Sequence, residues 1–166
     1  MARFVLVDEE REITDPAELT ALLDPLGVTY EKWEVEDRVA ADASDEEILR
    51  AYAPEIERLK TIRGYVKADV VNVDPSIPGL DDLLAKFSAE HIHPDDEVRF
   101  TVAGNGIFYV RSGCGAVLAV HVEAGDLLNV PAGTQHWFEV TESRTIRCIR
   151  LFNDPAGWAC EYVEAS

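Results

Sequence analysis

The most informative stretch of the chain is His91-Ile92-His93-Pro94-Asp95-Asp96-Glu97. Two imidazoles stand at positions i and i+2, so on an extended chain they point to the same side. Glu97 follows a tight Pro-Asp-Asp loop and can add a carboxylate oxygen from the start of the next strand. A further imidazole, His136, lies on a later segment that can pair nearby as a strand. We therefore predict a metal site whose ligands are His91, His93, Glu97 and His136.

The ligand set restricts which metal such a site would hold. Imidazole nitrogens with one carboxylate suit divalent iron, nickel, cobalt, manganese or zinc, whereas calcium and magnesium prefer oxygen ligands throughout. Four protein ligands around an octahedral ion leave two adjacent positions for a bidentate substrate. A single histidine on a strand is more often a surface or core residue, and H-x-H alone is a weak motif. However, three of the four histidines of this chain fall in the pattern, and only His121 is assigned no role.

After residue 96 the sequence has the alternation and the turn residues of a β protein. Short apolar segments with a period of two are separated by turns rich in glycine, proline and aspartate. The expected strands are Glu97–Ala103, Ile107–Arg111, Ala116–Val122, Leu127–Val130, Gln135–Val140, Thr145–Phe152 and Trp158–Val163. We interpret Gly104-Asn105-Gly106 as a hairpin turn, because no helix follows it as a nucleotide-binding loop would require. Many short strands at this regular spacing predict a barrel or a sandwich.

The first 90 residues carry helical signals instead. Asp15 and Pro16 form a cap and first-turn pair before leucines at helical spacing. Ser44 and Glu47 have the form of a capping box, after which apolar residues recur on one helical face as far as Ile62. The other elements expected here are a short helix and two extended segments, over Leu80–Phe87, Val28–Val35 and Tyr65–Val73. We expect one domain over residues 1–166, with a helix-rich N-terminal part over 1–90 and a metal-binding barrel core over 91–166.

Composition and charge argue against several kinds of partner. The chain has 166 residues, with 32 Asp and Glu against 15 Lys and Arg, and a formal net charge of −17 at pH 7. Such a chain would be repelled by nucleic acid and by anionic membranes, so we expect neither as a partner. No segment has the apolar length of a membrane span, and the N-terminus lacks the pattern of a secretion signal. We interpret the three cysteines, which have no C-x-x-C spacing, as reduced and structural, and we expect a cytoplasmic monomer.

Strand alternation indicates which side chains would share the barrel interior with the metal. Arg99 stands on the same strand face as Glu97, so a metal-facing Glu97 places Arg99 inside. A buried cation needs an anionic partner, which would be a substrate oxygen, or Glu90 if the role of the arginine is structural. Arg150 is either a substrate contact or one half of a structural ion pair. Phe138 alternates with the histidine ligand of its own strand and should line the cavity.

Two longer spacings resemble the motifs of the cupin superfamily, whose fold is a jelly-roll β-barrel with the metal inside. From His91 the chain reads H-x-H-x3-E-x6-G, and from Gly125 it reads G-x5-P-x-G-x2-H, ending at His136. Ala85 stands where the first motif often has glycine, and Val140 stands where the second often has asparagine. Both positions are usually structural, so the ligand assignment is kept. The resemblance implies a mainly β fold, a cupin jelly-roll β-barrel with an N-terminal helical part.

Further segments resemble one branch of that superfamily, the acireductone dioxygenases. They are Leu26–Trp33, Arg63–Tyr65, Glu90–His91, Asp96–Phe100, Asp126–Thr134, His136–Phe138, Ile149–Phe152 and Gly157–Trp158. They are spread over nearly the whole chain, which makes this resemblance more specific than the cupin motifs alone. By resemblance Phe87, Phe138 and Trp158 would lie around the substrate, although core packing is the simpler alternative for each.

The resemblance implies a metal-dependent dioxygenase of methionine salvage that holds one Fe²⁺ or Ni²⁺ ion per chain. Its substrates would be O₂ and an acireductone, the enediol-ketone that carries a methylthio group. With iron the family yields formate and the 2-keto acid precursor of methionine; with nickel it yields formate, carbon monoxide and methylthiopropionate. Arg99 would be catalytic, and Arg150, Phe87, Phe138 and Trp158 would bind the substrate. Two alternatives stay open: another cupin enzyme, such as a metal-dependent sugar-phosphate isomerase, and a non-catalytic cupin that binds a small ligand.

Overall fold

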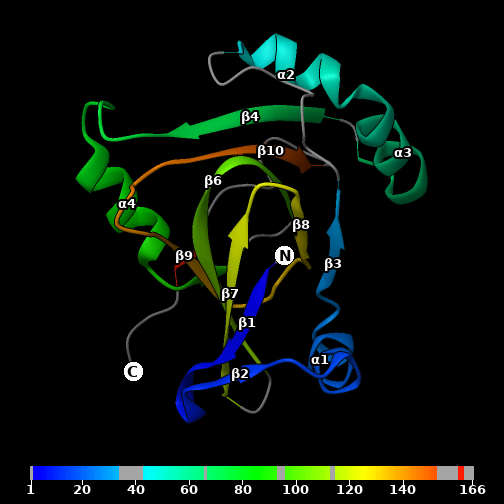
Figure 1. Cartoon of the computed structure of the whole chain (residues 1–166), viewed down its shortest axis with the longest axis vertical. Coiled ribbons are helices and arrows are strands. Elements are labelled where there is room, and N and C mark those ends of the chain that lie inside the picture. Colours follow the sequence, from blue (N-terminus) through cyan, green and yellow to red (C-terminus); the bar gives the residue numbers. More distant parts are fainter. Residues whose placement is uncertain are drawn as a thin grey trace.

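The structure is a computed structural model that describes residues 2–33, 43–65, 67–92, 96–112, 115–152 and 161–162. Within these residues the strands form one continuous sheet that curls around a core (Figure 1). Its two layers share the long strand β6 (Glu97–Arg111). Residues 97–104 of β6 pair in one layer and residues 105–111 pair in the other.

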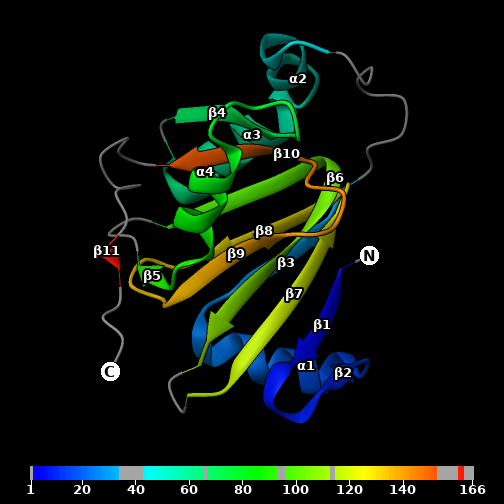
Figure 2. The ribbon, with the colours of Figure 1, turned by 90° about the vertical axis from the view of Figure 1, so that its left-hand side faces the viewer.

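Each layer is completed by shorter strands, several of which come from the first 90 residues (Figure 2). The first layer has the order β3 (Thr29–Lys32), β8 (Asp126–Val130), β6, β10 (Ile146–Phe152), β4 (Lys67–Val73). The second has the order β11 (Glu161–Tyr162), β5 (His91–Ile92), β9 (His136–Val140), β6, β7 (Val117–Glu123), β1 (Arg3–Leu6), β2 (Arg11–Ile13). The architecture is mainly β, as predicted, and strands from both halves of the sequence belong to the same sheet.

The helices lie in the N-terminal part, as predicted, and α1 and α2 begin at the two predicted caps. They are α1 (Pro16–Leu23), α2 (Asp45–Ala51), α3 (Ala53–Arg63) and α4 (Leu80–Ser88), with the 3₁₀ turns η1 (Val7–Glu9) and η2 (Asp24–Leu26). The side chain of Asp15 caps α1, and Ser44 with Glu47 forms the capping box of α2. The single helix expected after Ser44 is divided at Tyr52, because Pro54 in the first turn of α3 has no N–H to continue the hydrogen bonding of α2.

Two apolar clusters lie on opposite faces of the first layer. One is formed with α2 and α3, which cover the outer face near β4 and β10 (Figure 1), and it includes Ile48, Tyr52 and Phe100. The other takes side chains from both layers and includes Phe108 and Phe138. Because neighbours on a strand alternate between faces, Phe100 packs outward against the helices and Arg99 turns toward the space between the layers.

The hairpin expected at Gly104-Asn105-Gly106 is wrong, because β6 runs through these residues without a turn. A Cβ atom on Gly104, whose φ is +79°, would overlap the carbonyl oxygen of Thr145. One on Gly106 would lie 2.5 Å from Cε2 of Phe138. The glycines therefore mark the close approach of neighbouring elements where β6 passes between layers, and not a reversal of the chain.

The ends of the chain differ most from the expected elements. Strands β1 and β2 have no counterpart among the predicted strands, because the acidic run Asp8-Glu9-Glu10 interrupts the apolar pattern there. Of the last expected strand, Trp158–Val163, residues 161–162 are described, as β11. In the described parts of the chain no helix is long and apolar enough to cross a membrane.

Candidate metal centre

Two of the predicted ligands face each other on neighbouring strands. His91 on β5 and His136 on β9 are directly opposite in the strand register, and Figure 2 shows the two strands side by side. Their ring centroids are 4.6 Å apart in an edge-to-face arrangement. Both side chains are buried, with 5% and 2% of the residue surface exposed. The strand pairing thus brings together two imidazoles that are far apart in the sequence.

The two rings are oriented in the same way. Nδ1 of His91 is 2.6 Å from the carbonyl oxygen of Ala89, and Nδ1 of His136 is 2.8 Å from that of Thr134. A carbonyl oxygen can only accept, so Nδ1 is the protonated nitrogen and a neutral ring has its lone pair on Nε2. Metal-binding histidines in proteins usually have this arrangement, with the second ring nitrogen held by a carbonyl or a carboxylate.

The other two predicted ligands are less fully placed. His93 lies outside the described residues. Glu97 is the first residue of β6 and pairs with Val130 of β8, and its side chain is outside the described part. Among the described side chains there is no cluster of three or more His, Cys, Asp or Glu residues. The structure therefore brings two of the four residues together and leaves the full ligand set as a prediction.

Arg99 lies inside the barrel, as its strand alternation predicts. It is 7% exposed, and its Cζ atom is 5.9, 5.6 and 5.7 Å from the ring centroids of Phe87, Phe108 and Phe138. The ring of Phe138 in turn contacts both other rings, with centroid distances of 6.4 Å to Phe87 and 4.8 Å to Phe108. A buried cation is thus surrounded by three aromatic faces, which attract it through their quadrupoles.

Phe108 is missing from the predicted site because of a bulge in β6. Between Arg147 and Cys148 of β10 the partner on β6 moves from Ala103 to Thr101, so β6 has one extra residue there. Inward-facing positions are therefore odd-numbered before the bulge and even-numbered after it. A period-two extrapolation from Arg99 cannot reach Phe108 without knowledge of this extra residue.

Glu90, considered as a structural partner for Arg99, is paired with a different arginine. Its carboxylate accepts two hydrogen bonds from Arg111, with Nε at 2.7 Å and Nη2 at 3.0 Å. Arg111 is located at the end of β6, next to the segment that carries His136. The carboxylate before His91 is thus part of an ion pair beside the candidate site.

Arg150 forms an ion pair with Asp69 of β4. The Arg150 Nε and Nη2 atoms are 2.8 and 2.5 Å from the two carboxylate oxygens. In the strand register Arg150 is directly opposite Asp69 on one side and Arg99 on the other, so the three side chains project from one face of the layer. Of the two roles considered for Arg150, the ion pair is present. Trp158 lies outside the described residues.

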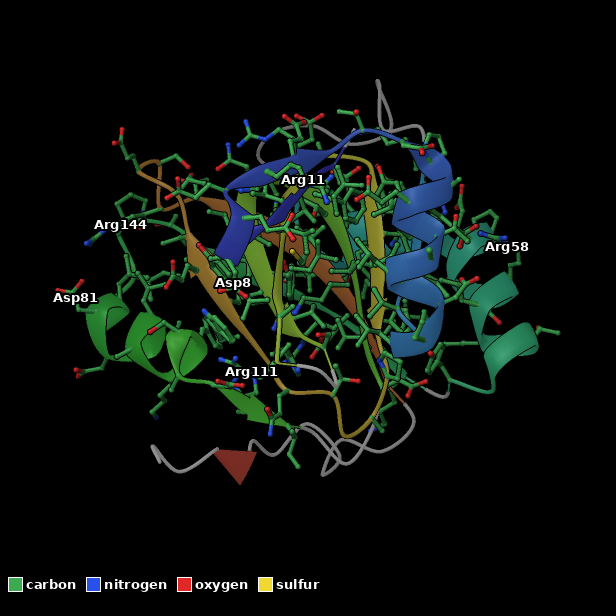
Figure 3. All side chains as sticks on the ribbon, turned by 90° about the horizontal axis from the view of Figure 1, so that it is seen from below. Asp8, Arg11, Arg58, Asp81, Arg111 and Arg144 are labelled. Carbon is green, nitrogen blue, oxygen red and sulfur yellow. The ribbon has the colours of Figure 1, made fainter. Side chains whose placement is uncertain are left out.

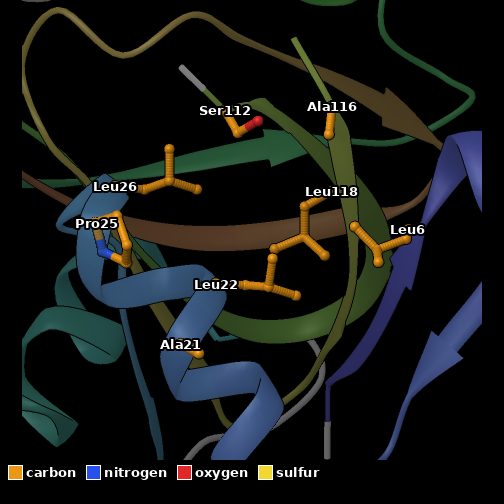
Figure 4. Close-up of a pocket in the computed structure, with 8 residues that line it drawn as sticks. All are labelled: Leu6, Ala21, Leu22, Pro25, Leu26, Ser112, Ala116 and Leu118. Atoms are coloured by element: carbon orange, nitrogen blue, oxygen red, sulfur yellow. The ribbon is translucent and has the colours of Figure 1, made fainter. Parts of the chain in front are cut away.

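An apolar pocket of about 360 Å³ occurs elsewhere, between α1 and strands β1 and β7 (Figure 4). Its lining residues are Leu6, Ala21, Leu22, Pro25, Leu26, Ser112, Ala116 and Leu118. None of them carries an ionisable side chain, so the pocket offers nothing for metal binding or proton transfer. It shares no residue with the predicted site.

Comparison with known proteins finds similarity over almost the full length of the chain. A family model described as the ARD/ARD' family matches residues 7–160. An acireductone dioxygenase of Sulfurihydrogenibium sp. is 45% identical over 173 aligned positions, which cover 99% of this chain and 96% of the relative. One of Pseudomonas paraeruginosa is 46% identical over 150 residues, 90% of this chain and 82% of the relative. The solved structure of an acireductone dioxygenase from Bacillus anthracis, with a cadmium ion in its active center, superposes with a TM-score of 0.88 at 35% identity and covers 98% of both chains.

Proposed function

The chain belongs to the ARD/ARD' family and has the cupin jelly-roll barrel, and from this membership we propose that it is an acireductone dioxygenase of methionine salvage. Its substrates would be O₂ and the methylthio-bearing acireductone. The similarity of named acireductone dioxygenases over nearly the whole chain supports this reaction. Within the structure, the observation that carries the proposal is the buried pair of imidazoles, His91 and His136, across β5 and β9.

The proposed metal ligands are His91, His93, Glu97 and His136. The fit is supported by the two described imidazoles, because their Nδ1 atoms bind backbone carbonyls and direct the lone pair to Nε2. Three imidazoles and one carboxylate suit a single Fe²⁺ or Ni²⁺ ion per chain. When bound, the metal supplies a Lewis acid and a template for two oxygens of the substrate.

Arg99 is proposed as the catalytic residue that stabilises the anionic form of the substrate. Its planar guanidinium can donate two parallel N–H groups to two oxygens of an enediolate. The aromatic rings around it lower the local dielectric, which strengthens the attraction between this cation and an anionic substrate. Phe87 and Phe138 also provide an apolar wall that suits a methylthio group and excludes water.

Arg150 and Trp158 complete the proposed substrate site. Arg150 projects from the same face as Arg99, and its ion pair with Asp69 holds the guanidinium in place. The similarity to named acireductone dioxygenases over nearly the whole chain favours the dioxygenase over a sugar-phosphate isomerase. We further propose that the chain is a single-domain, cytoplasmic monomer whose partners are small molecules and not nucleic acid or membranes.

Oxygen uptake with a synthetic acireductone tests the function. The protein is stripped of metal and reloaded with iron or with nickel, and formate, carbon monoxide and keto acid are assayed. Both forms should consume oxygen, and nickel should bind more tightly because an N/O site generally follows the Irving–Williams order. Iron should give the keto acid, and nickel should give carbon monoxide. If neither form consumed oxygen, the dioxygenase assignment would be wrong, and isomerisation or non-catalytic binding would have to be tested instead.

A further inference from the structure

Arg111 bonds to the residue that precedes each of the two histidines. Its guanidinium donates two hydrogen bonds to the carboxylate of Glu90, which stands immediately before His91. Its backbone N–H donates to the carbonyl oxygen of Gln135, 3.0 Å away, which stands immediately before His136. One residue at the end of β6 therefore connects the two segments that carry the imidazoles.

The same guanidinium is held from two further sides. Its Cζ atom lies 5.6 Å from the ring centroid of Trp137, the residue after His136. The Trp137 ring stacks on Tyr109 with a centroid distance of 5.0 Å and an interplanar angle of 6°. Nη1 of Arg111 donates to the carbonyl oxygen of Gly115 at 3.1 Å. This combination needs a planar cation with several donors in a fixed geometry, which lysine cannot provide.

We propose that Arg111 is a positioning residue for the metal centre, fixing the distance between the His91 and His136 rings by binding both of their segments. The inference rests on the proposed function, in which both rings are metal ligands. Each ring is oriented by the carbonyl two residues before it, at Ala89 and Thr134, so the position of each carbonyl sets the position of its ring. In both segments Arg111 bonds to the residue that lies between this carbonyl and the histidine, which is Glu90 in the first segment and Gln135 in the second. Loss of a partner that bonds directly to a metal ligand typically weakens metal binding about tenfold to a hundredfold, and Arg111 acts one residue further out, so we expect a loss at the lower end of this range.

Nickel titration of the stripped, full-length chain against a competing chelator tests this role. Arg111→Gln and Glu90→Gln should each raise the nickel Kd about tenfold. The double variant should be no weaker than either single one, because both remove the same contact. Arg111→Lys keeps the charge and loses the bidentate geometry, so it should also weaken binding. Cobalt-loaded Arg111→Gln should show an altered visible absorption spectrum, since the ligand geometry changes.

Arg11→Gln is the matched control. Arg11 on β2 also donates to two carboxylates, those of Glu9 and Glu18, and its replacement removes the same single charge. Figure 3 shows it on the N-terminal strands, well separated from Arg111. This variant should bind nickel like the parent, and thermal unfolding of each metal-free variant shows that the chain is folded. If Arg111→Gln and Glu90→Gln bound nickel with the same Kd as Arg11→Gln, the positioning role would be overturned. The proposal of the metal centre itself would not be affected by that result. A parent chain that bound no nickel would overturn the metal centre and the positioning role together.

Discussion

Replacement of Arg99 by lysine should lower turnover strongly and leave metal content unchanged. Lysine keeps the positive charge between the rings of Phe87, Phe108 and Phe138 but loses the planar fork that can contact two oxygens. If one charge-assisted contact worth about 1.5–3 kcal/mol is lost from the transition state, the rate falls roughly tenfold to a hundredfold. The free energy of unfolding should change less than the activation free energy, because the lysine ammonium keeps its contact with the aromatic rings. Such a cation–π contact contributes about 0.5–2 kcal/mol to stability.

Steady-state kinetics on metal-matched samples measures this effect. Arg147→Lys is the control, because Arg147 is on the same strand as Arg150 but on the opposite face. There Nη2 of Arg147 donates to the carbonyl oxygen of Ala43 and lies 3.6 Å from Oδ1 of Asp45. It should have the kinetics of the parent. An Arg99→Lys enzyme with parental kcat and KM would refute the catalytic role and make Arg99 a structural cation held by its aromatic neighbours.

Three further outcomes follow from the same structure. Alanine at any of the three proposed histidine ligands should remove most of the metal and abolish turnover, with His121→Ala retaining both; full metal content in a ligand variant would exclude that residue from the site. Gly106→Ala should lower the free energy of unfolding by about 1–3 kcal/mol, because the added Cβ would lie 2.5 Å from the ring of Phe138, and an unchanged urea midpoint would contradict this. Burial, together with the charge of Arg3, lowers the pKa of His121, so the unfolded chain binds more protons and stability falls on acidification through the usual histidine range. His121→Ala should therefore lose less stability than the parent between about pH 7 and pH 5, as measured by urea unfolding at both values.

The parts of the site that could be predicted from sequence depend on local spacing. The H-x-H pair and the later histidine are recognisable because few residue types bind metals, and three of the four histidines of the chain fall in one pattern. The inward direction of Arg99 follows from period-two alternation over a short distance. Helix caps at Asp15 and Ser44 are equally local, since the capping side chain binds a backbone N–H two or three residues away.

The parts that could not be predicted depend on register between distant strands. Phe108 reaches Arg99 only because a bulge shifts the alternation of β6. The segment Gly104-Asn105-Gly106 near the bulge has the residue types of a hairpin turn, although β6 runs straight through it. The partners Glu90 and Arg111 are 21 positions apart, and Arg150 and Asp69 are 81 apart, so neither pair leaves a local pattern. Such contacts are decided by how the curled sheet closes on itself, which the strand signals alone do not specify.

Anomalous diffraction at the nickel absorption edge, from crystals of the nickel-loaded chain, tests the central claim most directly. The claim is that the imidazoles brought together by β5 and β9 hold the metal of an acireductone dioxygenase. One strong peak is predicted, roughly 2.0–2.1 Å from Nε2 of both His91 and His136, which is the usual metal–imidazole distance. His93 and Glu97 should complete the ligand set around the same peak. A principal peak away from these two rings, or coordination through their Nδ1 atoms, would contradict the account.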